Sequence, residues 1–399
     1  MEPEPPFSIM SEAAMLMNPY SGQIICAKNP DELIAPASLT KIMTLAVTYD
    51  EIDNGFASLD DQVVISEKAW RTGGSKMFVS VNSTVPLRLL LEGIAIVSGN
   101  DACVAVAEHI AGSEDAFAEK MNRKAAEIGM RNTVFKNSHG LPDEQHTTAR
   151  DMALLARYYI SKHPEVLRMH STKALTYNAI TQPNRNGLLW LDSGFDGLKT
   201  GWFASAGYHI VATALRDQDR FIAVIMGAQS AKQRETIALQ LINYGFRNFT
   251  TVEILDPKQI LEQATVLKGK EDHVALGAAH SLKLTLPRHT LNDVVVQKDF
   301  VGSIAAPVTQ GQELGTARVI MQDKELASVP LVALETIERA GPVKLIVQTV
   351  KLSFIQPPYW GALLLALILI VAFILKVSSR QKKSSPFGMR GHKRRNDYV

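Results

Sequence analysis

Cysteine is scarce in this sequence, and the motifs that mark several common classes of protein are missing. The two cysteines, Cys26 and Cys103, allow at most one disulfide, and both stand in apolar stretches that favour buried free thiols. No His-Glu-x-x-His motif or paired-cysteine spacing is present. We therefore expect no catalytic metal and no cofactor.

A strong charge of either sign is also lacking over most of the chain. The 399 residues have a net charge of +2, and the basic excess is concentrated after residue 375. A mildly acidic folded part gives no indication of nucleic-acid binding. With 46% hydrophobic and 21% charged residues, the chain can bury a sizeable core. Its length suggests two folded units plus tails.

A long hydrophobic run occurs only near the C-terminal end. Residues 1–9 lack the basic and apolar regions of a secretory signal. The apolar run at residues 359–377 nearly spans a bilayer core of about 30 Å at about 1.5 Å per residue, which predicts a transmembrane anchor rather than a buried helix. The basic tail, residues 378–399, places the preceding chain outside the cytoplasm. We therefore infer that an export signal has been cleaved from the protein or omitted from this sequence.

Hydrophobic patterning divides the remaining chain into two folded units. Residues 10–250 predict strands and helices packed around one mixed core. Residues 255–348 contain short alternating runs between proline, glycine and asparagine, which predict a small β domain serving as a stalk. In the first unit, strands are expected at residues 13–17, 23–27, 207–214 and 220–227, and helices at residues 38–49, 87–96, 102–110, 115–129, 151–161 and 231–247.

A serine and a lysine stand three residues apart at the start of the first predicted helix. This spacing places Ser38 and Lys41 on one helix face. Burial and a nearby positive charge both lower an ammonium pKa, and a neutral lysine can accept the proton as a serine attacks a carbonyl. Taken alone, the pattern is better explained by a helix N-cap serine followed by a solvated lysine.

Two further short motifs follow in order along the first unit. Ser98-Gly99-Asn100 lies between two apolar helices, and Lys199-Thr200-Gly201 directly precedes a predicted strand pair. Together with Ser38-x-x-Lys41 they form the motif set of penicillin-recognising serine enzymes. Each motif is weak alone, but their order and context make the set specific.

Longer stretches around these motifs resemble the D-alanyl-D-alanine carboxypeptidases, the low-mass penicillin-binding proteins. The resemblance covers residues from about 10 to 350 and is carried by Pro36-Ala37-Ser38-Leu39-Thr40-Lys41, Ser98-Gly99-Asn100-Asp101-Ala102, Asn186-Gly187-Leu188-Leu189-Trp190 and Asp196-Gly197-Leu198-Lys199-Thr200-Gly201. It implies an α/β (α+β) serine β-lactamase/transpeptidase-like domain, with a central antiparallel sheet and helices, followed by a small all-β domain.

The same resemblance implies the substrate, the inhibitors and the location. Its members are serine D,D-carboxypeptidases that remove the terminal D-alanine from peptidoglycan pentapeptides and are inhibited by penicillins and other β-lactams. With the predicted anchor, we expect a bacterial inner-membrane protein whose catalytic domain lies on the periplasmic face.

The resemblance also assigns the acyl-transfer chemistry. Ser38 attacks the carbonyl of the penultimate D-alanine, and Lys41, neutral beside a charged Lys199, is the base. Ser98 relays the proton to the leaving amine. The backbone N–H groups of Ser38 and Trp202 form the oxyanion hole, and water then hydrolyses the ester.

Substrate binding is assigned to residues of the second and third motifs. Asn100 holds the substrate amide or Lys41. Lys199 and Thr200 face the terminal carboxylate, and Gly201 allows the strand edge to come close to the substrate.

Several positions depart from the pattern or match it only loosely. Trp202 stands where relatives often have histidine, and the stretch 70–78 resembles a shortened active-site rim, so substrate choice can differ. Arg185 and Arg234 match arginines at the carboxylate end of the cleft, with surface solubility as an equal alternative. His139 lies in a matching segment and is expected to shape a loop.

Two other functions stay open at this point. A β-lactamase needs a placed base for fast deacylation, and the sequence offers only Glu144 and Glu165 without a convincing motif. A catalytically silent protein that binds cell-wall or divisome partners is the second alternative, and the intact motifs argue against it.

Overall fold

The structure is a computed structural model that describes residues 2–141, 145–344 and 360–381. The first residue of the predicted anchor, the last residues of the predicted β domain and most of the basic tail lie outside the described residues.

The chain divides into two compact units whose boundary differs from the predicted one. The first unit includes the chain up to residue 256 together with residues 281–295, and the second includes residues 257–280 and the chain from residue 296. The reason is a long-range pairing: strand β10 (Phe249–Leu255) pairs antiparallel with strand β13 (Leu282–Pro287). Residues 281–295, which lie within the predicted β domain, therefore group in space with the first unit.

The first unit is organised around a five-stranded antiparallel sheet in the order β2-β1-β9-β8-β7. Its residues alternate between two buried faces, because Met15 and Met17 join one apolar cluster while Ala14 and Leu16 join another. Because both faces of the sheet are buried, side chains that point to either face are apolar, and the strands read as continuous apolar runs. The strands are β1 (Ala13–Met17), β2 (Ile24–Lys28), β7 (Phe195–Phe203), β8 (Gly207–Arg216) and β9 (Asp219–Ala228).

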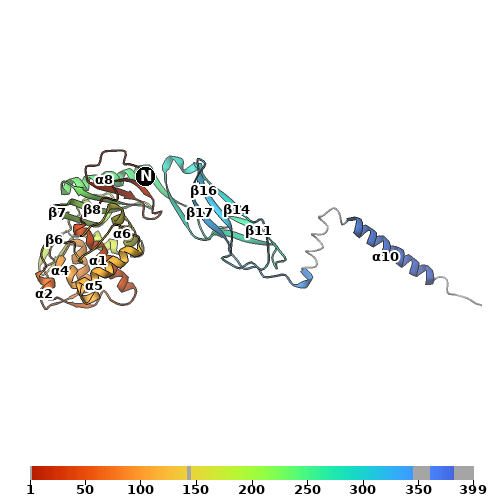
Figure 1. Ribbon diagram of the computed structural model, residues 1–399, viewed down its shortest axis with the longest axis horizontal. Coiled ribbons are helices and arrows are strands. Elements are labelled where there is room, and N and C mark those ends of the chain that lie inside the picture. Colours follow the sequence, from red (N-terminus) through yellow and green to blue (C-terminus); the bar gives the residue numbers. More distant parts are fainter. Residues whose placement is uncertain (1, 142–144, 345–359, 382–399) are drawn as a thin grey trace, which may run out of the picture. The chain divides into compact units, whose positions relative to one another are not determined.

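One face of the sheet is covered by helix α8 (Ala231–Asn248), which packs on β8 and β9 (Figure 1). Ser230 caps its N-terminus by accepting a hydrogen bond from the Gln233 amide. Ile237 and Leu241 recur with helical spacing and pack on the sheet. Burying each such side chain contributes about 1.5–3 kcal/mol.

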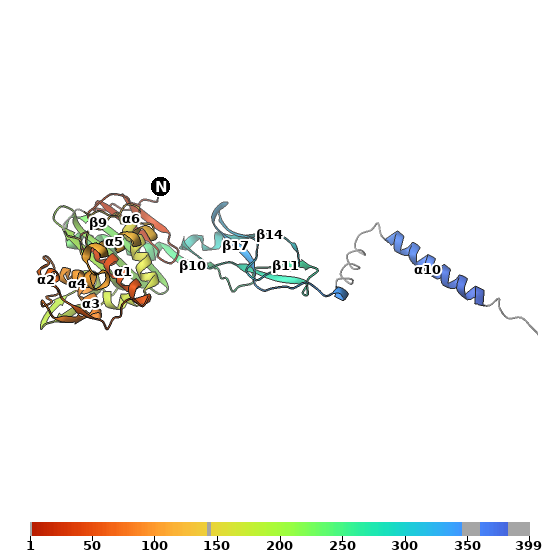
Figure 2. The ribbon, with the colours of Figure 1, turned by 60° about the horizontal axis from the view of Figure 1, so that its bottom comes forward.

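The opposite face carries a layer of helices around the buried helix α1 (Figure 2). Helix α1 is buried from Thr40 to Asp50, so it crosses the interior of this layer. The predicted helices of this layer are confirmed as elements, with ends that shift by at most four residues. They are α1 (Thr40–Asp53), α3 (Leu87–Ile96), α4 (Asn100–Ala111), α5 (Glu114–Glu127) and α6 (Ala149–Lys162). Two short helices that the sequence analysis did not predict, α2 (Glu67–Arg71) and α7 (Val166–His170), belong to the same unit.

Shorter elements complete the first unit. Two small antiparallel hairpins form, and 3-10 turns lie before α1, before β7 and after β13. They are β3 (Gln62–Val64) with β4 (Thr84–Pro86), β5 (Ala174–Tyr177) with β6 (Ile180–Pro183), η1 (Ala37–Leu39), η2 (Gly187–Trp190) and η3 (Arg288–Asp293).

The second unit is a six-stranded sheet in the order β14-β16-β17-β12-β11-β15. Its core contains Val266, Leu276 and Val308 among other small apolar residues. The predicted all-β character of this domain is confirmed. The strands are β11 (Glu262–Leu267), β12 (His273–Ala278), β14 (Val294–Phe300), β15 (Ser303–Ala305), β16 (Glu313–Met321) and β17 (Lys324–Ala333).

Residues 360–377 of the predicted anchor and the first residues of the basic tail form helix α10 (Trp360–Gln381). Among the residues that the structure describes, however, we find no helix with both the length and the apolar character needed to cross a membrane. The transmembrane part of the predicted fold is therefore not confirmed.

Candidate active site

Ser38 and Lys41 are in direct contact at the entry to α1. Ser38 lies in η1, and the buried Lys41 donates hydrogen bonds from Nζ to Ser38 Oγ at 3.0 Å and to the His139 carbonyl oxygen at 2.7 Å. The alternative of a capping serine and a solvated lysine is wrong, because Leu39 is the N-cap residue of α1 and Lys41 is 0% exposed. The buried path of α1 keeps the Lys41 amine out of water.

Ser98 brings a second polar group to the same hydroxyl. It lies between α3 and α4 with a φ of 64°, a left-handed conformation that costs about 1–3 kcal/mol in a non-glycine residue. From this position Ser98 Oγ donates a hydrogen bond to Ser38 Oγ at 3.1 Å. The first two motifs therefore meet at one oxygen atom.

The third motif lies on the edge strand β7. Lys199 is 3% exposed, and its Nζ donates to the Thr200 carbonyl at 3.1 Å. A Cβ on Gly201 would lie 3.3 Å from the Pro36 carbonyl oxygen, so glycine permits β7 to approach the segment that carries the nucleophile. Because β7 is the last strand of the sheet, its outer edge is available to an extended ligand.

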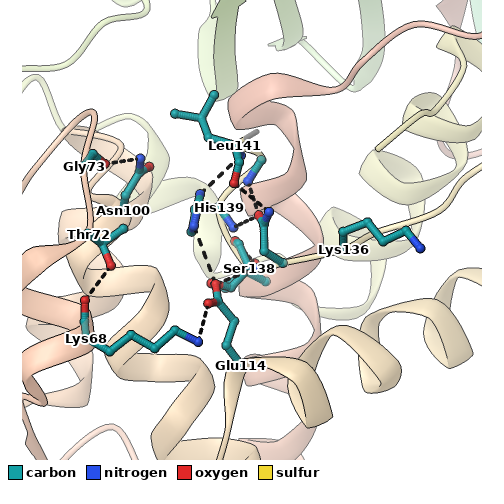
Figure 3. Close-up of polar contacts among 12 residues, drawn as sticks. Lys68, Thr72, Gly73, Asn100, Glu114, Lys136, Ser138, His139 and Leu141 are labelled. Carbon is teal, nitrogen blue, oxygen red and sulfur yellow. Dashed lines mark hydrogen bonds and ion pairs between the residues drawn. The ribbon is translucent and has the colours of Figure 1, made fainter. Parts of the chain in front are cut away.

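Asn100 is held by the rim of the site. Its Nδ2 donates to the Gly73 carbonyl at 2.7 Å (Figure 3). This bond fixes the amide at the edge of the cavity that Ser38 and Ser98 also line.

Eight of the ten predicted site residues line one cavity of about 630 Å³. The other two, Lys41 and Lys199, are buried beside it. The lining consists of Ser38, Gly74, Ser75, Ser98, Asn100, Leu141, Arg185, Thr200, Gly201, Trp202, Phe203, Tyr208 and Arg234.

Burial lowers the pKa of both lysines. It brings the pKa of Lys41 to about 8, with Arg185 adding to this effect while Cys103 and Asp101 oppose it. Burial also holds the pKa of Lys199 well below its usual value, and the charges of Lys41 and Arg185 lower it further. Desolvation is thus the main cause of the lowered Lys41 pKa, and the charge that adds to it is that of Arg185 rather than the predicted Lys199.

Comparisons with known proteins agree with this geometry. Residues 1–230 match the family described as D-alanyl-D-alanine carboxypeptidase, and residues 249–339 match the penicillin-binding protein 5 C-terminal domain. The D-alanyl-D-alanine carboxypeptidase DacD of Escherichia coli is 39% identical over 344 residues, which cover 84% of this chain and 88% of the relative.

Two solved structures extend the comparison. Penicillin-binding protein 5 from Haemophilus influenzae superimposes with a TM-score of 0.79 at 37% identity, covering 84% of this chain and 99% of that chain. Penicillin-binding protein D2 from Listeria monocytogenes, in its ampicillin-bound form, gives a TM-score of 0.56 at 29% identity and covers 61% and 100%.

The chain belongs to the D-alanyl-D-alanine carboxypeptidase family. Membership confirms the resemblance inferred from sequence and the serine D,D-carboxypeptidase class that it implied. It does not favour the two alternative functions.

The two arginines of this family member both line the cleft, Arg185 as an exposed residue and Arg234 as a buried one. Arg185 donates from Nη1 to Ser75 Oγ at 2.8 Å. Arg234 is 6% exposed and donates from Nη1 to the Gly201 carbonyl at 3.2 Å, which ties α8 to β7. Its Nε has no hydrogen-bond partner among the described residues. Two guanidinium groups therefore add positive charge near the third motif.

Trp202 presents an aromatic surface at the cleft. Its side chain is 54% exposed, and its ring centroid lies 5.9 Å from that of Tyr208 on the paired strand. Arg234 in turn lies over the Tyr208 ring at 5.7 Å. The side chain that departs from the family pattern is thus placed where it can touch a ligand.

Two buried carboxylates near the site escaped the sequence analysis. Asp101, the residue that follows Asn100, accepts hydrogen bonds from the amides of Met77 and Phe78 at 2.8 and 2.9 Å. It therefore fixes the rim of the cleft. Glu114 holds the segment that contains His139. For Asp101, the only signal in the sequence was its position directly after the Ser98-Gly99-Asn100 motif. For Glu114, no signal was present in the sequence.

Proposed function

We propose that the chain removes the terminal D-alanine of peptidoglycan pentapeptides through an acyl-enzyme on Ser38. The observation that carries this proposal is the pair of contacts at Ser38 Oγ, which lies 3.0 Å from Lys41 Nζ and 3.1 Å from Ser98 Oγ. A hydroxyl with a buried amine and a second hydroxyl within hydrogen-bond distance has a proton acceptor and a relay in place.

Acylation begins with neutral Lys41. Ser38 Oγ attacks the carbonyl carbon of the penultimate D-alanine, and its proton passes to Lys41 Nζ. The oxyanion is stabilised by backbone N–H groups of Ser38 and Trp202. As the peptide bond breaks, Ser98 delivers a proton to the leaving amine and is itself reprotonated by Lys41. D-Alanine leaves, and the acyl group stays as an ester on Ser38.

The terminal carboxylate of the substrate binds at the cationic end of the cleft. Lys199, Arg185 and Arg234 surround this end, and Thr200 offers a hydroxyl beside them. A carboxylate raises the pKa of neighbouring ammonium groups, so substrate binding favours a charged Lys199. Water then attacks the ester, with Lys41 again the proton acceptor, and Ser38 is regenerated.

Two measurements on the unmodified protein test the proposal. A synthetic pentapeptide ending in D-alanyl-D-alanine should release one D-alanine per molecule. A fluorescent penicillin should attach covalently, and mass spectrometry of the digested adduct should locate it on Ser38. Absence of both D-alanine release and labelling would refute the proposal.

Activity should rise with pH through the pKa of Lys41. Because the neutral amine is required and burial brings its pKa to about 8, kcat/KM should increase about tenfold per pH unit below this value and level off above it. The check is a pH series of D-alanine release between about pH 6 and 9. A profile without this rise would contradict the assignment of Lys41 as the base.

We propose β-lactams as inhibitors, supported by a relative of the same fold that was solved in an ampicillin-bound form. A β-lactamase would instead turn the drug over. Of the two glutamates considered for that role, Glu144 lies outside the described residues. Glu165 is exposed at the start of α7 and does not line the cleft. We expect a labelled penicillin to stay attached for minutes, and release within seconds would favour the β-lactamase.

We also propose that the catalytic unit lies on the periplasmic face of the inner membrane. The support is the location of peptidoglycan and the apolar sequence at residues 359–377 followed by a basic tail. Protease treatment of sealed inner-membrane vesicles of known orientation tests this arrangement. Cleavage of the basic tail from the periplasmic side would overturn it.

A further inference from the structure

Glu114 is a buried carboxylate between two segments that flank the cleft. It is the first residue of α5, and its side chain is 8% exposed. On one side lies the supporting segment, residues 137–141, and on the other lies the rim, which we define as residues 68–79. Figure 3 shows the Glu114 side chain with polar contacts to both.

The first set of contacts leads to the catalytic lysine. Glu114 Oε1 accepts hydrogen bonds from the backbone amide and the Oγ of Ser138, at 3.2 and 2.7 Å. The next residue, His139, provides the carbonyl that accepts Lys41 Nζ at 2.7 Å. Gly140 has a φ of 99°, and a Cβ there would overlap the Ala37 carbonyl, so this segment packs directly beside the nucleophile.

The second set of contacts leads to the rim. Glu114 Oε2 forms an ion pair with Lys68 Nζ at 3.0 Å. The Lys68 carbonyl accepts the Thr72 hydroxyl at 2.8 Å, and the adjacent Gly73 carbonyl accepts Asn100 Nδ2 at 2.7 Å. One carboxylate is thereby linked to the groups that hold Lys41 and to those that hold Asn100.

A general role at the helix terminus does not account for this arrangement. Acidic residues in the first turn of a helix are favourable, but the exposed Asp115 already supplies one. A buried carboxylate is costly unless its oxygens are paired, and here the contacts are directed at two cleft segments. Although burial raises the pKa of Glu114, hydrogen bonds from Ser138 and Lys68 more than compensate and lower it, so the group is ionised.

We propose that Glu114 is a positioning residue that acts by two separable routes: it holds the His139 carbonyl against Lys41, and through Lys68 it fixes the rim that holds Asn100. The proposal rests on the proposed function, since it assigns consequences for acylation of Ser38. The first route affects the rate of the chemical step, and the second affects substrate binding.

Three variants separate the routes. Glu114→Gln keeps the shape but removes the charge, Lys68→Met removes only the ion pair, and Lys68→Arg restores it. Glu119→Gln is the matched control, because Glu119 lies on the same helix with a 77% exposed side chain and contacts only Arg123 among the ion pairs described. Stopped-flow acylation by a fluorescent penicillin yields a limiting rate constant and an apparent Kd for each variant.

Glu114→Gln is expected to lower the limiting acylation rate about tenfold, because a misplaced catalytic group is costly even after a small shift. Lys68→Met is expected to raise the apparent Kd about threefold with a near-normal limiting rate, and Lys68→Arg should return it to the wild-type value. Glu119→Gln should behave as wild type. Ser138→Ala, which removes one hydrogen bond of the first route, should reproduce the direction of Glu114→Gln if the latter folds poorly.

Two outcomes would overturn the inference. One is a normal limiting rate in both Glu114→Gln and Ser138→Ala. The other is a parallel loss of rate and affinity in every variant, in proportion to the fall in thermal unfolding midpoint. Failure of the proposed function looks different, because wild-type protein itself would then not be labelled.

Discussion

Replacing Ser38 by alanine is expected to abolish covalent penicillin labelling and to lower D-alanine release roughly a millionfold, the scale seen when a hydrolase loses its catalytic serine. The substitution removes the one oxygen that Lys41 and Ser98 both contact. Without this oxygen, no nucleophile is present from which Lys41 could accept a proton. D-Alanine release from a pentapeptide and fluorescence of the labelled band provide the two measurements.

The control for this variant is a serine remote from the cleft. Ser171 follows α7, is partly exposed, and donates its hydroxyl to the Arg168 carbonyl. Ser171→Ala should therefore label like the wild type. Noncovalent penicillin binding and the thermal unfolding midpoint should persist in Ser38→Ala, because its side chain is only half-buried and loses a single atom. Undiminished D-alanine release in Ser38→Ala would exclude an acyl-enzyme on this residue.

Elements with a local periodic pattern were predictable from the sequence. The helix expected at residues 231–247 is α8 (Ala231–Asn248), and the strands expected at residues 207–214 and 220–227 are β8 and β9. Apolar residues with a period near 3.6 or 2 determine which face is buried, and this information lies within each segment. The motif residues were found for a similar reason, because each motif is contiguous.

Features that depend on distant partners were not predictable in this way. Asp101 holds amides at positions 77–79, and Glu114 holds Ser138, 24 residues away along the chain. In both cases the residues next to the carboxylate in the sequence do not indicate its hydrogen-bond partners. The pairing of β10 with β13, which groups residues 281–295 with the first unit, likewise joins segments that are distant in the sequence.

The start of α4 illustrates the intermediate case. Sequence predicted a helix from residue 102, but α4 begins at Asn100, so the last residue of the second motif is the first residue of the helix. The Asp101 carboxylate accepts a hydrogen bond from the Ala102 amide at 3.0 Å and also binds the rim amides. The Asp101 carboxylate thus accepts hydrogen bonds from an amide of the first turn of α4 and from amides of the rim, and this allows the helix to begin within the motif. This placement explains how Asn100 comes to face the cleft.

Replacing Lys41 by methionine is the second substitution with a large expected effect. Removal of a positioned general base is expected to lower acylation by about 10³- to 10⁴-fold. Methionine is unbranched and suits a position that is 0% exposed, and it removes an ammonium group that burial disfavours. The variant leaves the His139 carbonyl without its donor, at a cost of about 1–3 kcal/mol, so the fold should persist with moderately lower stability.

Lys41→Arg distinguishes a base from a positive charge. Arginine preserves the charge and can donate to the His139 carbonyl, but it does not lose its proton at accessible pH. If Lys41 acts as the base, both variants should lose acylation to a similar extent, and the rise in kcat/KM toward the Lys41 pKa of about 8 should disappear from their residual activity. Rapid labelling of Lys41→Arg would show instead that a fixed cation next to Ser38 is sufficient. The proton acceptor would then have to be sought elsewhere, with Ser98, which contacts Ser38, and the buried Lys199 as the candidates.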